Sequence, residues 1–198
     1  GSVEVFVPSE KVGQRLFKEI YKFYSKDNST NVCPLRTSIR KGEKPDDFYN
    51  RLLGEITIAE GERPKDAQTL FLLPFNLTGN ITQEEKNLIE SPLPLPFIDK
   101  LSRVFITTIK NESLIQVQDL KAVFDTGIEE VEFFDPDQSV VHIKEQLLPT
   151  DYMNQHKSML GLFGEGIYYK FTVMNESRPQ DRIPSVKRSD LGRQFLLL

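Results

Sequence analysis

Residues 69–75 (TLFLLPF) form the most continuously apolar segment of this 198-residue chain. The run is too short for a helix with one solvent-exposed face, and Pro74 and Asn76 stand at its end. A short apolar run bounded in this way is typical of a strand that is buried on both faces. We therefore expect the fold to be organised around a sheet with residues 69–75 inside it.

The first half of the chain alternates strand and helix patterns. Residues 3–7 alternate as a strand does, and Ser9 is the predicted N-cap of the following helix. Residues 35–39 are predicted as a second strand, and Pro45 begins a second helix that stops at Gly61. With the central strand this gives a β-α-β-α-β layer. The apolar side chains that should pack the first helix on the sheet recur every three or four residues: Val12, Leu16, Phe17, Ile20, Phe23 and Tyr24.

A sheet of this kind has a preferred place for ligands. In open α/β sheets, ligands tend to bind beyond the carboxyl ends of the strands. The residues that follow the central strand are 76–80. By this analogy alone, a ligand is expected near them.

The second half begins with a short helix and then turns mainly to strand patterns. Thr82 and Glu85 form a capping box for a helix that runs through Ile89. Residues 97–109 are compatible with either a helix or a strand. The later strand candidates, expected to form a meander, are residues 113–117, 121–124, 131–134 and 140–143, and residues 149 onward begin a less regular stretch. Residues 167–173 and 194–198 are predicted strands, separated by a polar loop.

These patterns predict the α+β class, with a mixed α/β first half and a mainly antiparallel β second half. Residues 91–96 (SPLPLP) are extended by their alternating prolines, so they are the candidate hinge between residues 3–90 and 97–198 of one compact domain. Gly1 and Ser2 resemble the remnant of an expression tag. Together with the apolar C-terminus, they lead us to expect a domain excised from a larger protein.

Charge and hydropathy limit the partners. The net charge of −4 and the pI near 5.4 argue against a dedicated nucleic-acid binder. No apolar run approaches the roughly 20 residues that cross a bilayer, so no direct membrane insertion is expected. One basic cluster remains, which is either solvated surface or a contact patch for phosphate or an acidic partner: Arg182, Lys187, Arg188 and Arg193.

The sequence predicts no metal site and no cofactor. Cys33 is the only cysteine, which excludes an intrachain disulfide and predicts a structural thiol. Acidic residues crowd positions 125–137, but residues 135–138 (DPDQ) have the composition of a type I turn. No nucleophile elbow, phosphate loop or metal-binding spacing occurs.

Residues 163–168 (FGEGIY) resemble the glycine turn and following strand of ADP-ribosyltransferases of the poly(ADP-ribose) polymerase type. The resemblance implies a nucleotide site in which Tyr168 stacks on nicotinamide, Gly164 and Gly166 form the turn, and His142 holds the ribose. This chain departs from the family at Ile143, where the family has glycine, and it has no later glutamate at a suitable distance. The alternative is that both glycines serve only a tight turn before a core strand.

Asparagine sequons are more frequent than composition predicts. Nine asparagines and 24 Ser or Thr residues predict about one sequon by chance, whereas five occur. They are the candidate glycosylation sites Asn28, Asn76, Asn80, Asn111 and Asn175. A single thiol argues against a secreted domain, so the lumenal or extracellular and the intracellular compartments both stay open and the localisation is unknown.

Taken together, the sequence favours a non-enzymatic protein-interaction or assembly domain that recognises another protein or associates with itself. The first alternative is an active or degenerate nucleotide-binding domain of the ADP-ribosyltransferase type. The second is a module that contacts nucleic acid through the C-terminal basic cluster.

Overall fold

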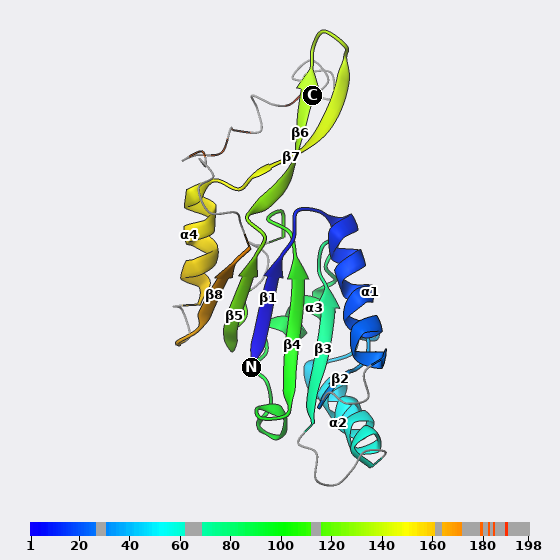
Figure 1. The fold of residues 1–198 in the computed structure, drawn as a ribbon. Helices are drawn as coiled ribbons and strands as arrows, with labels where there is room; N and C mark the ends of the chain where they lie inside the picture. Colours follow the sequence, from blue (N-terminus) through cyan, green and yellow to red (C-terminus); the bar gives the residue numbers. More distant parts are fainter. Residues whose placement is uncertain are drawn as a thin grey trace.

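The structure is a computed structural model of the 198-residue chain (Figure 1). It describes residues 1–26, 31–61, 69–111, 116–160 and 164–171, together with residues 179, 182, 184 and 189. The strands are β1 (Ser2–Phe6), β2 (Val32–Pro34), β3 (Leu70–Asn76), β4 (Leu101–Thr107), β5 (Leu120–Asp125), β6 (Ile128–Asp135), β7 (Val140–Leu147) and β8 (Ile167–Lys170). The helices are α1 (Glu10–Lys26), α2 (Pro45–Gly61), α3 (Gln83–Glu90), the 3-10 turn η1 (Leu95–Phe97) and α4 (Thr150–Met159).

Six strands form one parallel sheet in the order β2-β3-β4-β1-β5-β8. The other two, β6 and β7, form an antiparallel hairpin that extends beyond the carboxyl ends of the parallel strands (Figure 1). The predicted β-α-β-α-β order of the first half is confirmed. With a mostly parallel sheet, helices and a separate antiparallel strand pair, the predicted α+β class is also confirmed.

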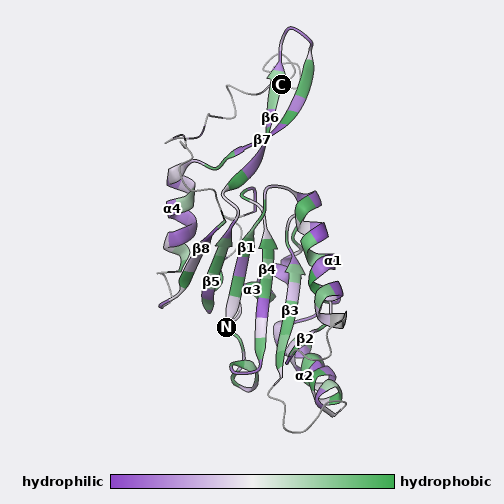
Figure 2. Ribbon diagram, in the orientation of Figure 1, coloured by the Kyte–Doolittle hydropathy of each residue, from purple (hydrophilic) through white to green (hydrophobic). Residues whose placement is uncertain are grey.

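The predicted central strand is β3, which lies between β2 and β4. Phe71 and Leu73 are fully buried, and the central strands are coloured mostly hydrophobic in Figure 2. Pro74 does not end the strand, which continues to Asn76. The short β2 pairs only with residues 70–72 of β3, so Pro74 lies past the end of that neighbour, where a missing backbone N–H is tolerated.

The helix α1 approaches the sheet closely at Gly13. A Cβ at this position would lie 2.4 Å from Cγ2 of Thr78, the residue two places after β3. The predicted apolar face is only partly buried: Leu16, Phe17 and Ile20 are half-buried, whereas Phe23 is 64% exposed. The close contact therefore depends on a small residue more than on the large apolar ones.

The second strand forms earlier than predicted. β2 occupies Val32–Pro34, so the prediction of a strand at residues 35–39 is wrong. Beyond β2, one further ladder bond joins the Leu35 amide to the Leu72 carbonyl at 2.8 Å. Polar contacts with α2 account for the difference. The Thr37 hydroxyl donates to Glu55, and Nη2 of Arg51 donates to the Ser38 carbonyl at 2.9 Å.

Two expectations for the second half are corrected. The candidate strands do not form a meander: β5 joins the parallel sheet beside β1, and only β6 and β7 pair antiparallel. The stretch from residue 149 is helical, because α4 buries Met153 and His156 and its C-cap Leu160. Within residues 97–109, which are compatible with helix or strand by sequence, Phe97 ends the turn η1 and residues 101–107 form β4. Predicted strands at 113–115 and 194–198 lie outside the described residues.

The short helix α3 and the connection from it to β4 pack on the hydrophobic core. The capping box predicted at α3 is present, with Thr82 and Glu85 bonded to each other's backbone amides. In the proline-rich segment that follows, Leu93 and Phe97 belong to the hydrophobic core.

In the described part of the chain, none of the helices has the length and hydropathy needed to cross a membrane.

A buried arginine ties this connection to the sheet. Arg103 on β4 is fully buried, an environment in which a guanidinium must be paired and hydrogen-bonded. Its Nη2 forms an ion pair with Asp119. Its other hydrogen-bond acceptors, at 2.9–3.1 Å, are the hydroxyls of Ser2 and Tyr49 and the carbonyls of Leu88 and Ser91.

Candidate functional site

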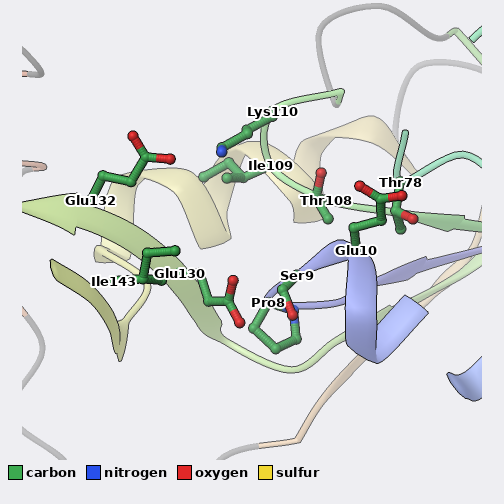
Figure 3. Close-up of a pocket in the computed structure, with 10 residues that line it drawn as sticks. All are labelled: Pro8, Ser9, Glu10, Thr78, Thr108, Ile109, Lys110, Glu130, Glu132 and Ile143. Atoms are coloured by element: carbon green, nitrogen blue, oxygen red, sulfur yellow. The ribbon is translucent and has the colours of Figure 1, made fainter. Parts of the chain in front are cut away.

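A cavity of about 270 Å³ lies at the carboxyl edge of the parallel sheet, between the first turn of α1 and the hairpin (Figure 3). Its walls come from four places: the β1–α1 turn, the residue after Leu77, the segment after β4, and the hairpin strands. The lining residues are Pro8, Ser9, Glu10, Thr78, Thr108, Ile109, Lys110, Glu130, Glu132 and Ile143.

The sheet brings these segments together because β3, β4 and β1 are parallel neighbours whose carboxyl ends meet at one edge. Backbone hydrogen bonds fix the loops beyond the strands. The Val7 amide donates to the Thr107 carbonyl at 2.9 Å, and the Leu77 amide donates to the Ile106 carbonyl at 2.8 Å. The Glu130 amide reaches the Pro8 carbonyl at 3.2 Å, which ties the base of the hairpin to the β1–α1 turn.

Two hydroxyl groups in the cavity wall are buried without a hydrogen-bond partner among the described residues. They are Oγ of Ser9 and Oγ1 of Thr108, whose residues are 8% and 5% exposed. Ser9 does occupy the predicted N-cap position, since its carbonyl accepts from the Gly13 amide at 3.0 Å. The side-chain capping bond is not formed. Since a buried hydroxyl without a partner carries a desolvation cost, both groups are suited to a bound ligand.

The electrostatics of the cavity are mixed. Helix geometry directs the first backbone N–H groups of α1, and the positive end of its dipole, toward the Ser9 side. Lys110 adds a cation, whereas Glu10, Glu130 and Glu132 add carboxylates. The Glu10 carboxylate accepts from Nε2 of Gln14 at 2.9 Å. The cavity thus offers donors near Ser9 and Thr108 and acceptors along the hairpin.

Three predicted glycosylation sites gather at the same edge of the sheet. Oδ1 of Asn76 accepts from the Thr78 hydroxyl at 2.8 Å, and Nδ2 of Asn111 donates to the carbonyls of Leu77 and Gly79. Asn80 alone of these three is exposed. A glycan on Asn111 would replace a hydrogen that the loop uses. Asn28 and Asn175 lie outside the described residues.

The predicted nucleotide residues are separated by the fold. His142 lies on the hairpin, with Nε2 at 3.8 Å from a carboxylate oxygen of Asp135, whereas Tyr168 lies on β8 of the parallel sheet. Of the two glycines that a tight turn would hold at positive φ, Gly164 has a φ of 141°, whereas Gly166 has no positive φ. Gly166 has a different requirement, because a Cβ there would lie 2.5 Å from Cδ2 of Leu160.

Tyr168 takes part in a buried polar cluster that the sequence did not reveal. Its hydroxyl donates to Oδ2 of Asp125 at 2.7 Å, and Nδ1 of His156 lies 2.7 Å from the same oxygen. Burial alone would raise the pKa of Asp125, but hydrogen bonds from His156, Tyr168 and the Gly127 amide together hold this pKa below its ordinary value. The ring of Phe6 stacks on His156 with a centroid separation of 3.6 Å. Asp125 and His156 are each only 1% exposed, so we expect the cluster to stabilise this edge of the sheet.

The C-terminal basic cluster is described only at Arg182. Its Nη2 lies 2.6 Å from the carboxylate of the buried Glu129, and its guanidinium lies over the Tyr152 ring at 5.6 Å. This side chain is thus engaged within the protein. Lys187, Arg188 and Arg193 lie outside the described residues.

The acidic residues of positions 125–137 and the Cys33 thiol were the other candidates for a chemical role. Oδ1 of Asp135 accepts from the Asp137 amide at 2.9 Å, as the predicted turn requires. Within the described ranges, no group of three His, Cys, Asp or Glu side chains could hold a metal ion. Cys33 is half-buried and packs against the core.

Sequence reasoning had placed a ligand near residues 76–80 but had not identified Ser9, Thr108 or Lys110 as candidates. Their place in the sequence could have identified them, because polar residues that directly follow buried parallel strands lie at the carboxyl edge of the sheet. The sequence does not show this position, because residues 97–109 are compatible with either a helix or a strand. Without the strand, its end could not be located.

No protein-family model matches this sequence, and no characterised protein matches it in sequence. Solved structures do match its fold, among them Escherichia coli HrpB, described once as a DExH-box NTPase and once as a DEAH/RHA helicase. Both matches are 16% identical, with TM-scores of 0.54 and 0.55, and cover 98% of this chain but 22% and 23% of the HrpB chains. The chain thus spans less than a quarter of those proteins. At this identity, the likeness shows that the fold of this chain also occurs within a helicase.

Proposed function

We propose that this chain is a helicase-type domain that binds the sugar–phosphate backbone of a nucleic acid in the cavity between α1 and the hairpin. The observation that carries the proposal is the pair of buried hydroxyls, Ser9 Oγ and Thr108 Oγ1, which lack partners among the described residues beside the first turn of a 17-residue helix. Hydroxyl and backbone N–H donors at a helix N-terminus bind phosphate oxygens.

The carboxylates on the hairpin define the ligand further. Glu130 and Glu132 would repel a second phosphate placed close to the first, but they can accept hydrogen bonds from sugar hydroxyls. A ribonucleotide backbone presents both a phosphate and a 2′-hydroxyl at each step. The site therefore suits one phosphate and the adjoining ribose.

This proposal departs from the expectation that nucleic acid is an improbable partner. That expectation rested on the net charge of −4, which governs long-range attraction to a polyanion. It does not govern hydrogen bonding to a single phosphate at a helix N-terminus. The likeness to a segment of HrpB, a protein described as a helicase, supports the nucleic-acid class over other phosphate ligands.

The test is the anisotropy of a labelled single-stranded RNA with Ser9→Ala and Thr108→Val variants. Each variant removes a donor to a charged acceptor, so RNA binding should weaken about tenfold. The thermal midpoint should not fall, because each substitution removes a buried hydroxyl that lacks a partner in the described structure. This separation of binding from stability is specific to a ligand-contacting hydroxyl.

Thr126→Val provides the matched control. The Thr126 hydroxyl is also buried without a partner among the described residues, but it does not line the cavity. RNA binding should be unchanged in this variant. Equal RNA affinity of the parent, Ser9→Ala and Thr108→Val proteins would overturn the proposal.

The sequence also favoured a non-enzymatic domain that recognises another protein. We retain this as a second proposed role, because exposed cations and half-buried aromatic rings meet on a different face of α1.

A further inference from the structure

The solvent-exposed face of α1 carries a line of cations. Lys11, Arg15, Lys18 and Lys22 recur at intervals of four, three and four residues, which places them on one side of the helix, and all four are exposed. Lys11 stands in the first turn, where the helix dipole disfavours a positive charge. In a chain with a net charge of −4, this line is a local concentration of positive charge.

The line ends at a groove of about 460 Å³ between α1 and the segment that follows β2. We call it the α1 groove. The half-buried rings of Phe17 and Tyr21 line it, as do three exposed cations, Lys18, Lys22 and Arg36. The two rings meet edge to face, with centroids 5.2 Å apart. Thr37 and Ser38 complete the lining.

Two hydroxyl groups in the wall of the α1 groove, those of Tyr21 and Thr37, are engaged within the protein. The Tyr21 hydroxyl donates to the Leu35 carbonyl at 2.8 Å, and the Thr37 hydroxyl donates to Glu55. Burial raises the pKa of Tyr21, against the opposing effect of Arg36, which agrees with a desolvated hydroxyl. The interior of the groove therefore offers apolar surface, and its charge is concentrated in the surrounding cations.

These cations are available to an outside partner. Among the described residues, neither Lys18 nor Arg36 forms an ion pair. Lys22 lies 3.2 Å from Glu19, but both side chains are more than half exposed. An exposed pair of this kind contributes little to stability and can exchange its partner.

We propose that the α1 groove binds an acidic protein segment, with an apolar or aromatic side chain against Phe17 and Tyr21 and carboxylates on the surrounding cations. Charge complementarity selects an acidic partner, and the apolar lining selects a side chain over a solvated chain of phosphates. A volume of about 460 Å³ suits one or two side chains. The partner contact is thus a short linear segment.

The contacts that the Tyr21 ring already makes within the protein favour a peptide over a nucleic acid as the partner. Single strands bind by stacking their bases on aromatic faces. The guanidinium of Arg36 already lies over the Tyr21 ring, 5.3 Å from its centroid, and Phe17 meets this ring at its edge. This site is separate from the cavity at the first turn of α1, so the inference does not depend on the RNA proposal.

The experiment titrates the whole chain into a fluorescein-labelled peptide in which adjacent phenylalanine and leucine are flanked on both sides by glutamates. The parent protein should bind it, and Lys18→Glu/Arg36→Glu should weaken binding at least about tenfold, because two attractive contacts become repulsive. A peptide with glutamine at every glutamate position should bind far more weakly. The matched control Lys157→Glu/Lys170→Glu makes the same charge change at two exposed lysines on α4 and β8, and it should bind within about twofold of the parent.

A labelled single-stranded oligonucleotide is the competing probe. If the oligonucleotide binds and loses affinity in Lys18→Glu/Arg36→Glu while the peptide does not bind, the surface recognises phosphates and the proposal is overturned. Failure of the peptide to bind the parent protein overturns it as well. Unchanged peptide binding in Ser9→Ala, together with loss in Lys18→Glu/Arg36→Glu, would support two independent sites.

Discussion

Nδ1 of His156 lies 2.7 Å from Oδ2 of Asp125, and both side chains are only 1% exposed. Tyr168 donates to the same carboxylate oxygen at 2.7 Å, and the Gly127 amide donates to the other at 2.6 Å. These contacts join α4 to β5 and to the edge strand β8. A buried carboxylate with this set of donors ties three elements to one point, so its removal should affect the fold more than any exposed acid does.

Asp125→Asn should lower the free energy of unfolding by about 2–4 kcal/mol, because the amide cannot accept from all the donors that face the carboxylate. Urea denaturation measures the change. Asp137→Asn, at an exposed turn position of the hairpin, is the control and should stay within about 0.5 kcal/mol of the parent. Equal stability of the two variants would show that the buried cluster contributes little.

The pKa of Asp125 predicts the direction of the acid response. Because this pKa is below the ordinary value of 3.8 in the folded protein, the unfolded chain binds the proton more readily than the folded one. The resulting stabilisation is fully present above pH 3.8 and is lost as the pH falls through the lower folded value. The stability difference between parent and Asp125→Asn should therefore be constant near neutral pH and narrow below about pH 4. Urea midpoints measured across this range test it, and a difference that widens with acid would contradict it.

Arg103→Lys should destabilise the protein by about 2–4 kcal/mol despite its unchanged charge. Lysine offers three donors from one point, whereas the Arg103 guanidinium bonds to Ser2, Tyr49, Leu88, Ser91 and Asp119 in several directions. Groups left without partners in the interior account for the loss. Arg40→Lys, at an exposed position, is the matched control and should be nearly neutral in the same urea experiment. A neutral Arg103→Lys would mean that this buried network is not required.

The parts of the fold that were predictable from the sequence are those set by nearby residues. The capping box of Thr82 and Glu85 fixes the start of α3, and Pro45 and Gly61 mark both ends of α2 as predicted. The apolar composition of residues 69–75 is enough to predict a buried strand. Each of these signals lies within one or two turns of the element that it specifies.

The parts that were missed depend on distant partners. Nothing near β5 indicates that it pairs in parallel with β1, more than a hundred residues earlier. α4 has a weak apolar stripe because His156 occupies one of its buried positions and is satisfied by Asp125 from another element. Ser9 is a residue type that favours the N-cap position, yet its side chain does not form the capping hydrogen bond. The candidate cavity was therefore predictable in location but not in its residues.

Two glycines in helices give opposite predictions for the same substitution. At Gly54 in α2, an added Cβ meets nothing within 4 Å, so Gly54→Ala should raise the free energy of unfolding by about 0.5–1 kcal/mol through helix propensity. At Gly13 in α1, the added Cβ would lie 2.4 Å from Cγ2 of Thr78, so Gly13→Ala should lower it by about 1–3 kcal/mol. Thr78→Ser removes that methyl group and should recover part of the loss in the double variant. Urea denaturation of the parent, Gly54→Ala, Gly13→Ala and the Gly13→Ala/Thr78→Ser double variant tests the close approach of α1 to the end of β3. Equal stabilisation by both alanine substitutions would contradict this close approach.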